Sequence, residues 1–121
     1  MRLDFHTLDV FTDRRFGGNP LAVVLAADAL SDAAMQAIAR EFNLSETAFV
    51  LKPADAANTA ALRIFTPARE LPFAGHPTVG SAILIAELER KGGCALETTI
   101  RLEEQVGVGR FDIAIQEKRR T

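Results

Sequence analysis

The sequence FAGHPTVG at residues 73–80, followed by the apolar run SAILIA at residues 81–86, is the most informative feature of this chain. Gly75 frees the backbone for a close approach, and Pro77 fits the first helical position, where no N–H donor is needed. These residues predict a helix with His76 at its N-cap. The N–H groups of a first helical turn lack intrahelical acceptors and lie at the positive end of the helix dipole. The sequence therefore predicts a seat for a carboxylate or phosphate at this helix start.

Two helices of different character are expected. Residues 79–88 carry little polar surface over their first two turns, so we expect protein to surround this helix nearly all round. A second helix begins after Ser31, a favourable N-cap residue. Its apolar side chains recur at the spacing of one buried helical face: Met35, Ile38, Ala39 and Phe42.

The remaining periodic segments indicate strands. Apolar or alternating runs occupy residues 3–11, 21–26, 47–51, 62–66, 98–102 and 110–115. They do not alternate regularly with helices. We therefore predict a single α+β domain over residues 1–121, with a mixed sheet around one apolar central helix and an amphipathic helix packed outside.

Composition narrows the possible partners and location. The chain has 121 residues, 48% of them hydrophobic and 25% charged, and a formal net charge of −2. This balance predicts a soluble globular protein with no nucleic-acid partner and no membrane partner. The basic cluster at residues 118–120 is interpreted as a solvated tail. Cys94 is the one cysteine and cannot form an internal disulfide, which favours a reducing, cytoplasmic location.

Glu46 is the leading candidate for a general acid or base. It lies where a helix gives way to an apolar strand, beside Leu44, Ala48 and Phe49. A partly dry setting raises the pKa of a carboxyl group towards neutrality, where proton transfer is most efficient. The alternative is a solvated or capping glutamate. For His76, likewise, a capping role and a catalytic role both remain open.

Other polar residues carry weaker signals. Asn19, in a Gly-Gly-Asn-Pro turn, could hold a polar group of a substrate or simply form the turn. For Glu70 we favour a structural bridge to Arg63 or Arg69. The two histidines, His6 and His76, show no ligand spacing, so no metal site is predicted.

Three blocks of the sequence closely resemble the phenazine biosynthesis PhzF-like isomerase family. They are FGGNPLAV at residues 16–23, NLSETAF at residues 43–49, and residues 64–80, which run from Ile-Phe-Thr-Pro to Gly-His-Pro-Thr-Val-Gly. The resemblance implies a diaminopimelate epimerase-like fold. In that fold two similar halves each wrap a strongly curved sheet around a central helix, and the active site lies between them.

The resemblance also implies roles for the candidate residues. Glu46 matches the catalytic glutamate, which removes a proton from one carbon and can return it to another, and His76 matches the histidine beside it. The amides of Gly75 and His76 match the donors that hold the substrate carboxylate, and Pro77 belongs to the same motif. No cofactor is implied, and the substrate is expected to be a small carboxylate-bearing metabolite.

Family members are substantially longer than this chain, which therefore corresponds to the N-terminal half. The chain would then be a fragment, a half that dimerises to rebuild a cleft, or an inactive remnant. We expect a homodimer or association with a missing second half. The alternative function is a non-catalytic, self-associating module that binds carboxylates.

Overall fold

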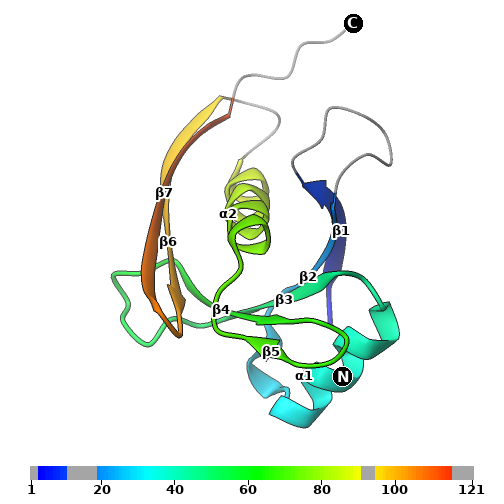
Figure 1. Cartoon of the computed structure of the whole chain (residues 1–121). Helices are drawn as coiled ribbons and strands as arrows, with labels where there is room; N and C mark the ends of the chain where they lie inside the picture. The colour runs from blue at the N-terminus through cyan, green and yellow to red at the C-terminus, as the bar shows by residue number, and fades with distance from the viewer. Residues whose placement is uncertain (1–2, 11–18, 91–94, 116–121) are drawn as a thin grey trace, which may run out of the picture.

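The computed structural model describes residues 3–10, 19–90 and 95–115 of the chain. These contain the strands β1 (Phe5–Val10), β2 (Asn19–Val24), β3 (Glu46–Leu51), β4 (Ala60–Phe65), β5 (Glu70–Leu71), β6 (Leu96–Glu104) and β7 (Gly107–Ile115), the helices α1 (Asp32–Phe42) and α2 (Gly75–Glu89), and a short 3-10 helix, η1 (Ala27–Ala29). The strands form one sheet in the order β1-β2-β3-β4-β6-β7, with β5 paired to β4. The sheet curves around α2, and α1 lies outside it (Figure 1). This is the predicted α+β architecture.

The sheet is mixed, and its parallel pairs explain where the helices lie. β2 pairs with β3, and β4 with β6, in parallel, whereas the neighbouring pairs are antiparallel. A parallel pair needs a crossover connection, usually a helix. The first crossover contains α1 and the second contains α2. One crossover therefore covers each face of the sheet (Figure 1).

Alternation along the strands divides the core into two parts. The part around α2 contains Ala48, Leu62, Ile64, Ile100 and Leu102 from the strands. The part around α1 contains Val24, Phe49 and Phe65 together with Met35 and Ala39 of the helix. Successive strand residues point to opposite faces. A strand residue's position in this alternation therefore tells which helix it faces.

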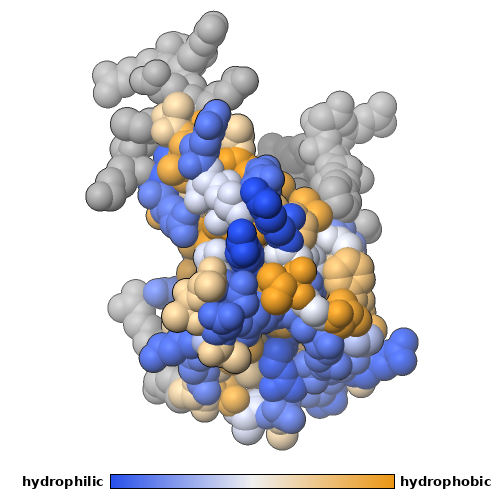
Figure 2. All heavy atoms as spheres, turned by 90° about the vertical axis from the view of Figure 1, so that its left-hand side faces the viewer, coloured by the Kyte–Doolittle hydropathy of each residue, from blue (hydrophilic) through white to orange (hydrophobic). Residues whose placement is uncertain are grey.

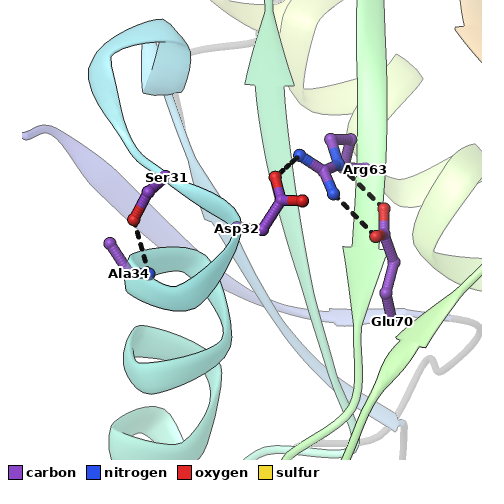
Figure 3. Close-up of polar contacts among 5 residues, drawn as sticks. All are labelled: Ser31, Asp32, Ala34, Arg63 and Glu70. Atoms are coloured by element: carbon purple, nitrogen blue, oxygen red, sulfur yellow. Dashed lines mark hydrogen bonds and ion pairs between the residues drawn. The ribbon is translucent and has the colours of Figure 1, made fainter.

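The predicted start of α1 is confirmed, and an arginine ties this helix to the sheet. Oγ of Ser31 accepts a hydrogen bond from the amide of Ala34 at 3.1 Å. Arg63 of β4 binds Glu70 of β5 through two nitrogens, at 2.8 and 2.7 Å, and Asp32 through a third, at 2.6 Å (Figure 3). The structural bridge expected for Glu70 is thus made to Arg63. Hydrogen bonding to Arg63 lowers the pKa of Asp32.

Two expectations about α2 were wrong. The helix begins at Gly75 with Ala74 as its N-cap, so His76 is its second residue and Pro77 its third. Proline is tolerated throughout a first turn, because the N–H that it lacks would have no intrahelical acceptor there. The helix is also not surrounded all round, since Ile83 is 48% exposed and Leu88 50% exposed. Hydropathy alone does not tell whether another element covers an apolar face.

Candidate active site

Glu46 lies at the point where the chain enters the sheet from α1. Asn43 ends the helix in the left-handed conformation, with φ of 52°, and turns the chain towards β3. Glu46 is the first residue of β3 and has the same strand parity as Ala48 and Val50, which pack in the core around α2. Alternation therefore directs its side chain to the face of the sheet that carries α2.

His76 meets Glu46 from α2. Its Nε2 atom lies 2.8 Å from Oε2 of Glu46, and the two side chains are 17% and 15% exposed. The contact is an ion pair when the imidazole is protonated, and its geometry falls short of a well-directed hydrogen bond. Two residues far apart in the sequence thus form a sheltered acid–imidazole pair at the start of α2.

The start of α2 offers main-chain donors. The N-cap residue Ala74 provides no side-chain hydrogen bond, and the first turn contains no acidic residue. Gly75 is exposed, and the space beside its Cα is open to 4 Å. Pro77 is buried and has no N–H, so among the first three helical residues only Gly75 and His76 carry amide hydrogens. Such a terminus attracts anions.

Asn19 is the first residue of β2, and its backbone pairs with Val10 of β1. The parallel register opposes Leu21 of β2 to Glu46 of β3, which puts the start of β2 at the same end of these two strands as Glu46. The side chain of Asn19 lies outside the described part of the structure, as do the Gly-Gly pair before it and Cys94. Its expected contact with a substrate therefore stays a prediction.

A groove lies between α2 and β7, but none of the predicted site residues lines it. Its walls include Val79 and Ile83 of the helix and Phe111, Ile113 and Ile115 of the strand.

Within residues 3–10, 19–90 and 95–115, no group of three or more His, Cys, Asp or Glu side chains could hold a metal ion. In the same ranges, no helix is long and apolar enough to cross a membrane.

Sequence analysis missed one acidic residue at this helix. Oε1 of Glu104 of β6 lies within hydrogen-bond distance, 2.8 Å, of the hydroxyl oxygen of Thr78, the fourth residue of α2. The predicted strand ended at residue 102, so Glu104 was left outside it. The alternation of Ile100, Leu102 and Glu104, extended by one more step, would have placed it on the side facing α2.

Comparison with known proteins identifies relatives of the whole chain. Residues 8–121 match the PhzC-PhzF family, described as "Phenazine biosynthesis-like protein". An uncharacterised isomerase from Mesorhizobium japonicum is 59% identical over 99 residues, which are 82% of this chain and 32% of that protein. The trans-2,3-dihydro-3-hydroxyanthranilate isomerase of Pseudomonas chlororaphis is 46% identical over 109 residues, which are 90% of this chain and 37% of that protein.

Solved structures agree with this relationship. A PhzF family protein from Enterococcus faecalis matches with a TM-score of 0.76 and 36% identity, over 90% of this chain and 39% of that one. A hydroxyproline epimerase from Agrobacterium vitis matches with a TM-score of 0.63 at 16% identity, which shows a shared epimerase-like fold. The matched region thus spans well under half of each relative. On sequence and structure alike, the chain belongs to the phenazine biosynthesis-like, PhzC-PhzF, family.

Proposed function

We propose that this chain supplies one half of the active site of a cofactor-independent isomerase. In this proposal Glu46 is the general acid and base, and His76 is its partner. The observation that carries the proposal is the 2.8 Å contact between Glu46 Oε2 and His76 Nε2 at the start of α2. The names of the family's relatives add support, because several of them are isomerases.

The chemistry follows from the arrangement of a base beside main-chain donors. The ionised carboxylate of Glu46 takes a proton from a carbon of the substrate, and the electron pair left behind spreads onto the substrate's conjugated acceptor groups. The amides of Gly75 and His76 hold the substrate carboxylate, and the positive helix end stabilises the negative charge that develops. Glu46 then returns the proton to a different carbon. The proton moves only between the substrate and Glu46, and the electron pair stays on the substrate, so the reaction needs no oxidant or reductant.

The proposed substrate class is a small, carboxylate-bearing metabolite. The related Pseudomonas protein is named for a dihydroaromatic amino acid, trans-2,3-dihydro-3-hydroxyanthranilate. We further propose that residues 1–121 correspond to the N-terminal half of such an enzyme, and that the second side of the cleft comes from another polypeptide segment. The cytoplasmic location expected from the lone cysteine stays a prediction.

A second candidate function is a self-associating, non-catalytic module that binds carboxylates at the same helix start. The half-exposed apolar side chains of α2, Ile83 and Leu88, favour this alternative. Such a module would keep the anion seat but transfer no proton.

Deuterium incorporation separates the two functions. The chain is incubated in D2O with trans-2,3-dihydro-3-hydroxyanthranilate, and deuterium in the recovered compound is measured by mass spectrometry. The isomerase proposal expects incorporation that falls by about 100-fold or more in Glu46→Gln, the scale of general acid–base catalysis. Glu41→Gln, the same change at an exposed position of α1, serves as the matched control. Binding without exchange supports the module, and exchange that persists unchanged in Glu46→Gln rejects the role proposed for Glu46.

A further inference from the structure

Glu104, the last residue of β6, lies on the side of the sheet that packs against α2. Alternation along β6 puts it on the same side as Ile100 and Leu102, which are fully buried. Its Oε1 atom lies 2.8 Å from Oγ1 of Thr78, the fourth residue of α2. Glu104 therefore joins the end of a strand to the helix start that forms the proposed anion seat.

The hydroxyl of Thr78 has two acceptors for one hydrogen. Its Oγ1 atom lies 2.8 Å from Oε1 of Glu104 and also 2.8 Å from the carbonyl oxygen of Ala74. A hydroxyl donates once, and a carbonyl oxygen only accepts. Threonine in a helix often donates to the carbonyl four residues earlier. If Thr78 donates to Ala74, both contacts are satisfied only when Glu104 is protonated and donates to Thr78.

The surroundings of Glu104 favour the neutral form. Burial raises its pKa, and this outweighs the hydrogen bond with Thr78, which acts in the opposite direction. The main charged groups on the elements packed around Glu104 contact residues other than Glu104. On α2, His76 contacts Glu46, and Glu87 pairs with Arg90. On the strands, Arg63 binds Asp32 and Glu70, Arg110 pairs with Asp112, and Glu103 accepts hydrogen bonds from residues 54, 55 and 58. None of them is a cause of the shift.

We propose that Glu104 is a positioning residue for the start of α2 and that it acts in its protonated form. The neutral acid donates to Thr78, Thr78 donates to Ala74, and this chain of bonds fixes the N-cap residue directly before Gly75. When Glu104 loses its proton, Thr78 can donate to only one of its two neighbours, so its oxygen faces the other acceptor oxygen with no hydrogen between them, and the two repel each other. A negative charge then also lies near the helix start. The terminus is then held less firmly and attracts an anion less, a consequence for catalysis that rests on the proposed function.

The sign of the pH dependence follows from the raised pKa. The folded chain binds this proton more tightly than the unfolded chain, whose glutamate has the ordinary value of 4.5. The stabilisation from protonated Glu104 is therefore fully present below pH 4.5. It is lost as the pH rises through the higher value of the folded chain.

NMR titration of the isotopically labelled chain tests the proposal. The Glu104 carboxyl carbon should titrate with a midpoint above 4.5, and the backbone amide of Gly75 should shift with the same midpoint. Glu104→Gln, whose side-chain amide can donate to Thr78 at any pH, should abolish the Gly75 transition. Glu97→Gln, the same change at an exposed position of β6, should retain it.

Two results would overturn the proposal: a Glu104 midpoint at or below 4.5, or a Gly75 amide that does not respond when Glu104 titrates. Thr78→Val removes the hydroxyl and should also uncouple Gly75 from Glu104, whereas Thr78→Ser should restore the coupling. These variants keep the test decisive if Glu104→Gln does not fold. The titration is done without substrate and tests only the role of Glu104, whereas the exchange experiment tests the role of Glu46. Either proposal can therefore be rejected while the other stands.

Discussion

Glu103 and Glu104 are neighbours on β6, yet their environments act on them in opposite directions. Glu104 faces α2, and burial raises its pKa. Glu103 points to the other side, where its carboxylate accepts hydrogen bonds from Asn58 Nδ2 at 2.7 Å and from the amides of Ala54 and Asp55 at 2.7 and 2.9 Å. Strand alternation thus shifts the pKa values of two adjacent glutamates in opposite directions.

This contrast predicts that Glu103→Gln destabilises the chain only when the native carboxylate is ionised. The pKa of Glu103 is lowered by its bond to Asn58 and then by the two amides, so its contribution is present above the ordinary value of 4.5 and is lost as the pH falls through the lower folded value. We expect a lower urea midpoint for the variant at pH 7. The difference should disappear in acid.

Urea denaturation of Glu97→Gln is the control for this prediction, because Glu97 is exposed on the same strand. A Glu103→Gln deficit that persists unchanged in acid would mean that lost packing, not the bonds to the carboxylate, causes the destabilisation.

The N-cap residue of α1, Ser31, allows a direct test of how much a locally predicted cap stabilises the chain. Ser31→Ala removes the acceptor for the amide of Ala34 and should lower the free energy of unfolding by about 1 kcal/mol, the usual cost of a lost N-cap. Ser31→Asn can still accept that hydrogen bond and should stay close to the parent chain. Thermal and urea unfolding would measure both variants, and equal stability of the alanine variant would show that Ser31 does not cap α1 in solution.

The start of α1 was predictable because its cap and its apolar spacing are both local. The start of α2 was placed two residues late, since proline at residue 77 is compatible with several positions of a first turn. The contact of Arg63 with Asp32 joins residues 31 positions apart. No periodicity of the sequence indicates such a pair, because it depends on the order of strands in the sheet.

The candidate site, like the contact of Arg63 with Asp32, joins distant residues that sequence periodicity does not bring together. Residue type and local context made Glu46 one possible base among several glutamates. Its closeness to His76 was implied by the family resemblance, since the two residues lie on different elements. Spacing in the sequence could not have shown which end of β3 meets the start of α2.

For the molecule as a whole, one edge of the sheet lies beside the partly exposed helix α2. β1 and β7 end the strand order in the described part of the chain, and the groove between α2 and β7, lined by apolar side chains together with Arg110 and Asp112, adjoins β7. Seen from the side of β6 and β7, the surface mixes hydrophilic atoms with separate hydrophobic patches, so this side presents no continuous apolar face (Figure 2). The half-exposed helix within the curve of the sheet is therefore the better candidate for a contact with another chain.

We propose that a second copy of this chain covers that helix face in solution, and Ile83→Lys tests this. Ile83 is 48% exposed and lines the groove, so a buried charge there should weaken self-association by about tenfold or more, which corresponds to about 1.4 kcal/mol. Sedimentation equilibrium would measure the dissociation constant, with circular dichroism to verify folding. Val106→Lys, the same kind of change at a 66% exposed valine in the β6–β7 turn, should associate like the parent. A parent chain that stays monomeric at every concentration would contradict the proposal.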